Sequence, residues 1–166
     1  MIHLTKKCII YIIKKRGKEM RYVSLMSKII AQRLHEVVLD GELGIDYTFA
    51  GDRAKNIALR RKYKVNDAKM KEILLEITEA HYSKSELSTN KDHPNDVVHV
   101  FKIQEDLMPR FVENSSYENV CIYVKITWPD GMKPMFIISF HEDEEWNFTF
   151  KMYNQAKLNM MIIYNL

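Results

Sequence analysis

The chain has 166 residues, a formal net charge of +3 and an apolar fraction of 46%. A chain of this length can bury a hydrophobic core as one domain, and its charged fraction of 28% argues against a disordered protein. Its two cysteines, Cys8 and Cys121, lie in no Cys or His motif of the kind that binds structural zinc. We therefore expect one folded domain with reduced thiols, which is typical of a cytoplasmic protein.

The N-terminal segment joins an apolar run at residues 8–13 to a basic stretch at 14–18. The run is too short to span a bilayer, lysines flank it, and no small-residue cleavage site follows it. The segment can be an added strand, a basic arm for nucleic acid, or a loose extension. We favour the last because chain termini are seldom ordered unless tied down. We expect a basic extension over residues 1–20, a single domain over 21–153 and a C-terminal extension over 154–166, with no membrane partner.

The first half of the chain carries the helix signals. Apolar residues recur at helical spacing between Ser24 and Val38, and Gly41 is the expected stop. Residues 44–51, which include two glycines, are typical of a loop. The pattern therefore predicts one amphipathic helix, with its apolar face toward a core, followed by an irregular segment.

A second, short helix is expected over residues 53–63, with Asp52 as its cap. Its cations, which are accompanied by no acidic residue, are Arg53, Lys55, Arg60, Arg61, Lys62 and the adjoining Lys64. Two interpretations remain open. A charge run is commonly just a solvated helix face, but a surface of one sign also suits contact with a phosphate backbone.

The third helix is the best marked of the three and is expected over residues 67–82. Asn66 is its expected N-cap, and four apolar residues recur on one face: Met70, Ile73, Leu74 and Ile77. Serine- and threonine-rich sequence then follows, and a proline soon bars further helix. The helix would therefore deliver His81, Tyr82 and Lys84 to one exposed corner, where a cation can meet a phosphate.

In the second half of the chain the pattern changes from helical to β. The β-prone runs expected to form strands are residues 97–102, 120–127 and 134–140. The last two flank a Trp-Pro-Asp-Gly turn at 128–131, which predicts an antiparallel hairpin. Residues 103–119 are expected to form a long polar connection, and residues 147–153 are a candidate fourth strand.

Alternation along the hairpin sorts its side chains onto two faces. The apolar sets expected to pack against the helices are Ile122, Val124 and Ile126, then Phe136, Ile138 and Phe140. The residues left on the open face are Tyr123, Lys125, Ser139 and His141. This combination is more specific than ordinary polar alternation, but the solvated face of an antiparallel sheet explains it without any function.

Several of these segments, taken in order, resemble one family. They are residues 42–47, the helix at 70–80 leading into Tyr82-Ser83-Lys84-Ser85, then Val100-Phe101-Lys102, Tyr123-Val124-Lys125-Ile126-Thr127 and Ile138-Ser139-Phe140-His141. Between about Glu42 and Glu142 the chain resembles the MqsR-type mRNA interferase toxins of bacterial type II toxin–antitoxin systems. No single segment is specific, and the resemblance lies in their order and spacing.

The resemblance implies a RelE-like α+β fold, in which N-terminal helices pack on one face of a small antiparallel sheet. It also implies metal-independent endonucleolytic cleavage of mRNA, without a cofactor. The partners it implies are mRNA and a cognate antitoxin protein, and it leaves open whether the ribosome is needed.

The resemblance also points to particular residues. The family's active-site lysine falls on Lys84 and its strand tyrosine on Tyr123. Two positions depart from the family. His141 replaces a lysine, and the family's glutamine falls near Val98, where the neighbouring His99 can supply a hydrogen bond instead.

Metal-free RNA cleavage needs a base for the ribose 2′-hydroxyl, an acid for the leaving 5′-oxygen, and cations for the charge that develops at phosphorus. Histidine suits proton transfer and lysine suits charge stabilisation. We therefore assign His141 as acid or base, Lys84 as the stabilising cation and Tyr123 as a base-stacking or proton-relay group. His99 and His81 are secondary candidates for proton transfer. The residues expected to contact RNA are His81, Tyr82, Lys125, Arg53, Arg60 and Arg61.

A non-catalytic RNA-binding or protein-interaction module with the same fold is the alternative. Val98 favours this module because its side chain cannot replace a glutamine, whereas Lys84, Tyr123 and His141 together favour the nuclease. A metal-dependent nuclease has little support, because even the acidic run at 142–145 lacks the spacing of metal ligands.

Overall fold

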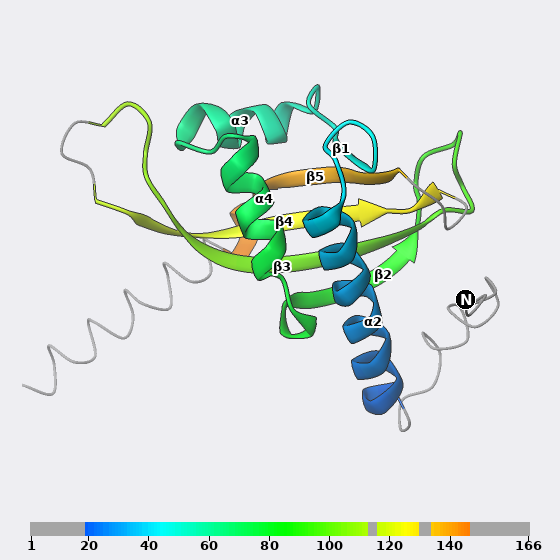
Figure 1. The fold of residues 1–166 in the computed structure, drawn as a ribbon. Coiled ribbons are helices and arrows are strands. Elements are labelled where there is room, and N and C mark those ends of the chain that lie inside the picture. Colours follow the sequence, from blue (N-terminus) through cyan, green and yellow to red (C-terminus); the bar gives the residue numbers. More distant parts are fainter. Residues whose placement is uncertain (1–18, 113–115, 130–133, 147–166) are drawn as a thin grey trace, which may run out of the picture.

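The computed structural model describes residues 19–112, 116–129 and 134–146, which form an α+β fold with a five-stranded sheet (Figure 1). Its helical elements are α2 (Glu19–Asp40), α3 (Ala54–Lys62), α4 (Asp67–Glu76) and the 3-10 turn η1 (Glu79–His81). Its strands are β1 (Tyr47–Phe49), β2 (Tyr82–Leu87), β3 (Val97–Leu107), β4 (Glu118–Thr127) and β5 (Met135–Glu142). The C-terminal extension, the candidate strand at 147–153 and nearly all of the basic N-terminal extension lie outside the described residues.

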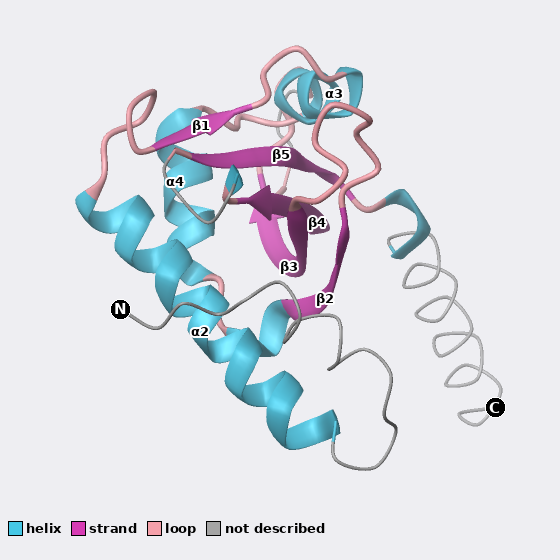
Figure 2. Ribbon diagram, turned by 90° about the vertical axis from the view of Figure 1, so that its right-hand side faces the viewer, coloured by secondary structure: helices cyan, strands magenta, loops and turns pink. Residues whose placement is uncertain are grey.

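The sheet is mixed rather than purely antiparallel. Its strand order is β1-β5-β4-β3-β2, in which β1 runs parallel to β5 and every other neighbouring pair is antiparallel. Figures 1 and 2 show α2 and α4 crossing the same face of the sheet. Their apolar side chains form one buried cluster with those of β3, β4 and β5. The opposite face of the sheet carries neither of these helices.

Helix α2 confirms the first predicted helix and extends it at both ends. Its buried stripe includes Leu34 and Val38, which are spaced by one turn and pack into the core. The helix ends before Gly41, whose N–H donates to the carbonyl of Val37 at 3.0 Å. A Cβ at this position would lie 2.2 Å from that carbonyl oxygen, so the close approach requires glycine. Among the described residues, no helix is both long and apolar enough to cross a membrane.

Helix α4 begins as predicted but ends early. The Asn66 side chain accepts a hydrogen bond from the Lys69 N–H at 2.9 Å and caps the helix. The predicted continuation to residue 82 is wrong, because α4 ends at Glu76. Beyond this end, the Thr78 N–H donates to Nδ1 of His81 at 3.0 Å. This side-chain bond competes with the helical pattern and stabilises the short turn η1 instead.

Two strands were not predicted, and one connection was wrongly assigned. Residues 44–51 contain β1, which is too short to give a periodic signal. Residues 82–87 form the edge strand β2 rather than an exposed corner. The expected polar connection at 103–119 is wrong at both ends, because β3 continues to Leu107 and β4 begins at Glu118, and the two strands pair from Val98 to Leu107. The side chains of this extra part of β3 alternate between the two faces as in any strand, and Ile103 and Leu107 face the core.

The predicted antiparallel pairing of the β4–β5 hairpin is confirmed, but half of its expected register is wrong. Tyr123 lies opposite His141 and Lys125 opposite Ser139, whereas the next pair is Ile126 with Ile137. Ile138 is therefore an extra residue on β5, a bulge that reverses the faces beyond it. Ile137 is consequently 0% exposed, and Phe136, which was expected inside, is 38% exposed.

Helix α3 lies along the free edge of β5, beyond the short strand β1 (Figure 2). The buried side chain of Asn56 joins the two elements. Its Nδ2 donates to the carbonyl of Ala50 at 2.7 Å, and its Oδ1 accepts from the N–H of Phe140 at 2.9 Å. The expected Asp52 cap is wrong, because the helix begins one residue later, after Arg53. Through Oδ1, Asn56 thus gives the free edge of β5 a hydrogen bond of the kind that another strand would provide.

Candidate functional site

Polar side chains converge on the face of the sheet opposite α2 and α4. Cross-strand pairing sets Lys102, Tyr123 and His141 side by side on β3, β4 and β5. The Tyr123 and His141 rings stack, with centroids 5.1 Å apart and an interplanar angle of 13°. Directly opposite pairs in a sheet point their side chains to the same side, so register alone builds this row. We call this side of the sheet the open face.

A second row crosses the open face one step along the strands. It contains Lys84 on β2, Val100 on β3 and Lys125 on β4. Glu86 joins the two lysines: its Oε2 lies 2.6 Å from the Nζ of Lys84, and its Oε1 lies 3.1 Å from the Nζ of Lys125. The hydrogen bond from Lys84 lowers the pKa of Glu86, and the same bond raises the pKa of Lys84. Glu86 and Lys84 are therefore both charged at neutral pH.

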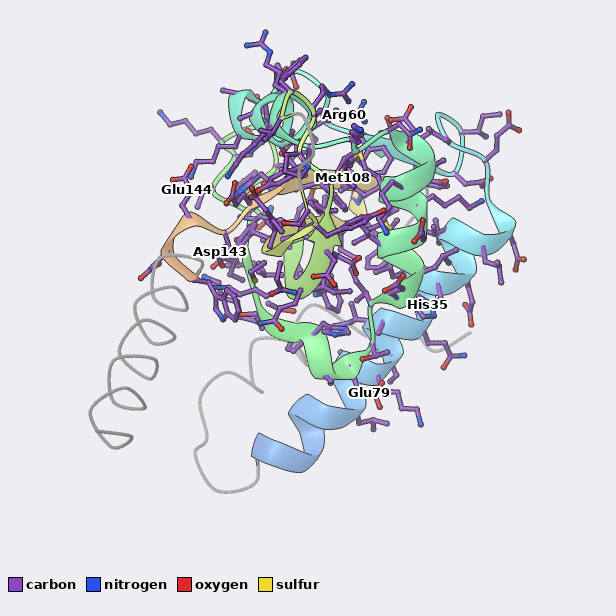
Figure 3. All side chains as sticks on the ribbon, turned by 90° about the vertical axis from the view of Figure 1, so that its left-hand side faces the viewer. His35, Arg60, Glu79, Met108, Asp143 and Glu144 are labelled. Carbon is purple, nitrogen blue, oxygen red and sulfur yellow. The ribbon has the colours of Figure 1, made fainter. Side chains whose placement is uncertain are left out.

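Lys102 has an acidic partner of its own at the end of β5. Its Nζ lies 2.6 Å from Oδ2 of Asp143, a buried carboxylate. The hydrogen bond that Lys102 donates to Asp143 raises the pKa of Lys102. Figure 3 shows Asp143 and the α2 residue His35 on opposite sides of the sheet. Each of the three lysines on the open face is thus paired with a carboxylate.

The stacked pair differs from these lysines in its chemistry. Burial raises the pKa of the Tyr123 phenol, which therefore stays protonated at neutral pH. The Nδ1 of His141 lies 2.9 Å from the carbonyl oxygen of Glu142 and must be the donor, because a carbonyl can only accept. This bond directs a neutral His141 ring to keep its proton on Nδ1, which leaves Nε2 as the nitrogen that can accept a proton.

His99 does not join this group, because one residue along a strand reverses the face. Val98 lies on the open face, whereas His99 is 8% exposed on the helix-covered side, with its ring centroid 5.7 Å from that of Trp128. Its Nδ1 lies 2.6 Å from Oγ of Ser85, which in turn lies 2.7 Å from the hydroxyl of Tyr82. Burial lowers the pKa of His99 to about 4. The geometry therefore supports a structural role for His99.

Two residues expected at an RNA-binding corner lie apart from the open face. The ring of Tyr82 packs edge-on against Phe101 at 5.7 Å, on the helix-covered side of β2. A bulge between Tyr82 and Lys84 places these two side chains on opposite faces. His81 accepts a hydrogen bond within η1, and burial lowers its pKa. The structure thus brings Lys84 to the site and leaves His81 and Tyr82 outside it.

The basic helix lies at the edge of the sheet rather than over the open face. Arg60, labelled in Figure 3, forms an ion pair with Asp67 at the start of α4. Lys62 pairs with Glu142, the residue after His141, at 2.8 Å. Arg53 and Arg61 are exposed and form no ion pair with any described residue. The one-signed surface expected from the sequence is therefore partly neutralised, and it meets the site only through Lys62.

Sequence reasoning missed Glu86, Lys102 and Asp143 as members of the site. Glu86 stands two residues after Lys84, so recognition of β2 as a strand would have placed both on one face. Lys102 lies on the same face of β3 as Val98 and Val100, so alternation along this correctly predicted strand would have placed it on the open face. Asp143 follows β5 directly, and its position relative to Lys102 depends on pairing across three strands, which no local pattern reveals.

The assembled face offers cations, one histidine and a neutral phenol within a single surface. This set can bind a phosphate, stack a planar base and transfer a proton. In the described ranges, no three His, Cys, Asp or Glu side chains are grouped closely enough to hold a metal ion. Comparisons with protein-family models, with curated proteins and with solved structures found no match. The function is therefore argued from the open face itself.

Proposed function

We propose that the chain is a metal-independent endoribonuclease that cleaves mRNA, acting as the toxin of a toxin–antitoxin pair with a RelE-like fold. One observation carries the proposal. Lys84, Tyr123 and His141 share the open face, and the last two rings are stacked. These three residues come from three different strands, so only folding brings them together. Their chemical types are those that RNA cleavage without a metal requires.

His141 is the proton-transfer group in this proposal. As a base, its Nε2 takes the proton of a ribose 2′-hydroxyl while the 2′-oxygen attacks the adjacent phosphorus. The bond from phosphorus to the 5′-oxygen then breaks, and that oxygen takes a proton from an acid. The products are a 2′,3′-cyclic phosphate and a 5′-hydroxyl end. His141 is the only histidine on the open face among the described residues, so it serves one of these two steps and water or Tyr123 serves the other.

The lysines stabilise the charge of the transition state. A preorganised donor aimed at the developing charge contributes about 3 kcal/mol where water is excluded. Lys84 and Lys125 lie on the same face, where both contact Glu86, and Lys102 lies beside Tyr123. Tyr123, protonated and stacked on His141, provides a flat surface for a nucleobase. The exposed Arg53, just before α3, and Arg61 on α3 would extend RNA contact along the edge of the sheet.

A non-catalytic RNA-binding or protein-interaction module is the second candidate. The observation that favours it is the pairing of all three lysines with carboxylates, which neutralises much of the open face. In such a module the same surface would take a partner protein, including an antitoxin, without cleaving RNA. The apolar Val98, where the family resemblance expects a glutamine, supports the same alternative.

Induced expression in a bacterial host tests the proposal against this alternative. We expect wild type to arrest growth and to produce new 5′-hydroxyl ends in cellular mRNA, and Lys84→Ala to relieve both effects. Lys91→Ala is the matched control, since Lys91 is an exposed lysine in the loop between β2 and β3. A wild-type chain that is expressed and folded but leaves growth and mRNA ends unchanged would favour the binding module.

A further inference from the structure

The Glu86 carboxylate bridges two strands that are not neighbours. Lys84 lies on β2 and Lys125 on β4, and β3 runs between these strands. Because both ion pairs are on the open face, the bridge from Lys84 through Glu86 to Lys125 passes over β3. The β3 side chains of the open face that pair with Glu86 and Lys84 are Val98 and Val100. These valines are 1% and 0% exposed although they lie on the face that neither α2 nor α4 covers.

We propose that Glu86 occupies a phosphodiester subsite of the open face, and that RNA binds by displacing this carboxylate from Lys84 and Lys125. The inference rests on the proposed function, because that function makes RNA the ligand. The phosphate takes the place of the carboxylate between the two ammonium groups. Its sugar or base then packs on Val98 and Val100, which the departing side chain uncovers.

The geometry of the bridge suits this exchange. Each carboxylate oxygen of Glu86 contacts a different lysine, at 2.6 and 3.1 Å. A phosphodiester also presents two charged oxygens on one atom, so it can satisfy the same two ammonium groups, and lysine binds phosphate well as a point charge. A phosphate thus replaces the interactions that the carboxylate gives up.

Release of Glu86 requires little structural change. Its side chain is 33% exposed and stands on an edge strand, so rotation about its side-chain bonds carries the carboxylate into solvent. Ion pairs with this degree of exposure are weak, because solvent screens the two charges. Ser85, between Lys84 and Glu86 in the chain, is hydrogen-bonded to His99 on the other face. The backbone of β2 is therefore held in place while the side chains on the open face exchange partners.

Val98 and Val100 form an apolar floor beneath the bridge, and this floor explains why residue 98 is not the glutamine that the family resemblance expects. A polar side chain at residue 98 would lie under the bridge and need a hydrogen-bond partner there. Valine needs none, and once uncovered it offers an apolar surface to a ribose or a base. The stacked rings of Tyr123 and His141 belong to the adjacent row, about 7 Å along the strands. A nucleotide on the valine floor would therefore lie next to the proposed proton-transfer group.

Binding of a fluorescein-labelled, single-stranded 2′-O-methyl RNA of mixed sequence, followed by fluorescence anisotropy, tests the inference. This RNA cannot be cleaved through its 2′-oxygen, so binding is measured apart from catalysis. Glu86→Gln removes the competing charge and keeps the shape, and we expect Kd to fall about 5- to 10-fold. Glu72→Gln is the matched control, because Glu72 forms an exposed 2.7 Å ion pair with Lys69 on α4. We expect this control to bind like wild type.

Lys84→Ala and Lys125→Ala should each weaken binding, and combining either with Glu86→Gln should remove most of the gain. Equal or weaker binding by Glu86→Gln, or no binding by any variant, would overturn the subsite. Cleavage of an unmodified RNA is measured in parallel. Tighter binding by Glu86→Gln with no cleavage by wild type would reject the nuclease and keep the subsite. Cleavage by wild type, without tighter binding by Glu86→Gln, would keep the nuclease and reject the subsite.

Discussion

Glu105 makes the stability of the fold depend on pH. It lies on the helix-covered face of β3, 7% exposed, with its Oε2 3.6 Å from Nζ of Lys69 on α4. Burial, reinforced by the nearby carboxylate of Glu76, raises the pKa of Glu105 to about 7. A glutamate in an unfolded chain has a pKa of about 4.3. At a pH between these two pKa values, Glu105 is therefore protonated in the folded protein and ionised in the unfolded chain.

The sign and size of the effect follow from this difference. Stability rises with pH where the unfolded state binds more protons, and here the folded state binds more. The free energy of unfolding should therefore fall as pH rises from about 4.3 to about 7. A difference of roughly 2.7 pKa units sets an upper limit of about 3.7 kcal/mol, and solvent screening reduces this to roughly 1–2 kcal/mol.

Glu105→Gln removes this titration while keeping the size of the side chain. In urea unfolding, we expect the variant to match wild type near pH 5 and to exceed it by roughly 1–2 kcal/mol near pH 8. Asp106→Asn is the control, because Asp106 is exposed on the opposite face of the same strand. If Glu105→Gln loses stability between these pH values as steeply as wild type, the argument from buried Glu105 is refuted.

Two further predictions concern how the edges of the fold are held. Asn56→Ala should lower the free energy of unfolding by about 3 kcal/mol, because it leaves the N–H of Phe140 without its acceptor, whereas the exposed Asn119→Ala should cost under about 1 kcal/mol in the same urea titration. Gly41→Ala should cost roughly 1–3 kcal/mol by thermal or urea unfolding, because its Cβ would collide with a carbonyl oxygen 2.2 Å away.

Gly51→Ala is the control for Gly41→Ala, since a Cβ at Gly51 meets nothing within 4 Å. Equal stabilities of the two glycine variants would contradict the close approach at the end of α2. For Asn56→Ala, a loss no larger than that of Asn119→Ala would show that its bonds to the edge of β5 add little.

The helices could be predicted where their signals were local. The apolar repeat within α2 and the Asn66 cap of α4 involve residues within a turn or two, and both are confirmed. The end of α4 could not be read in this way, because Ile77 fits the helical repeat but is buried in an extended conformation after the helix. That misreading hid β2, and with it the pairing of Lys84 with Glu86.

The site was predictable to the extent that strand parity is fixed by the sequence. Tyr123, Lys125 and His141 share a face, as expected. Tyr123 lies directly across the hairpin from His141, and Lys125 is two residues further along the same strand. The same alternation excludes His99 from the site, because adjacent residues of a strand point to opposite faces and Val98 lies on the open face. The bulge at Ile138 was not predictable, because the residues from Phe136 to Phe140 are apolar at nearly every position and allow either register.

The ion pairs show why charge counted along the chain is a poor guide to this surface. Every charged residue between 53 and 64 is a cation, yet Arg60 and Lys62 form ion pairs with acidic residues on α4 and β5. On the open face, Lys102 and Lys125 are likewise paired with residues distant in sequence. Under the proposed function these carboxylates keep a cationic face from binding anions indiscriminately, and RNA must compete with them.

Cleavage of purified mRNA by the purified full-length chain, with EDTA present, tests the central claim most directly. We expect wild type to cut and to leave 2′,3′-cyclic phosphate ends. His141→Ala and Lys84→Ala should each slow cutting by about 100-fold or more, whereas His93→Ala, in the exposed loop between β2 and β3, should have no effect. Cutting that persists undiminished in both site variants, or a wild-type chain that binds RNA without cutting it, would contradict the account.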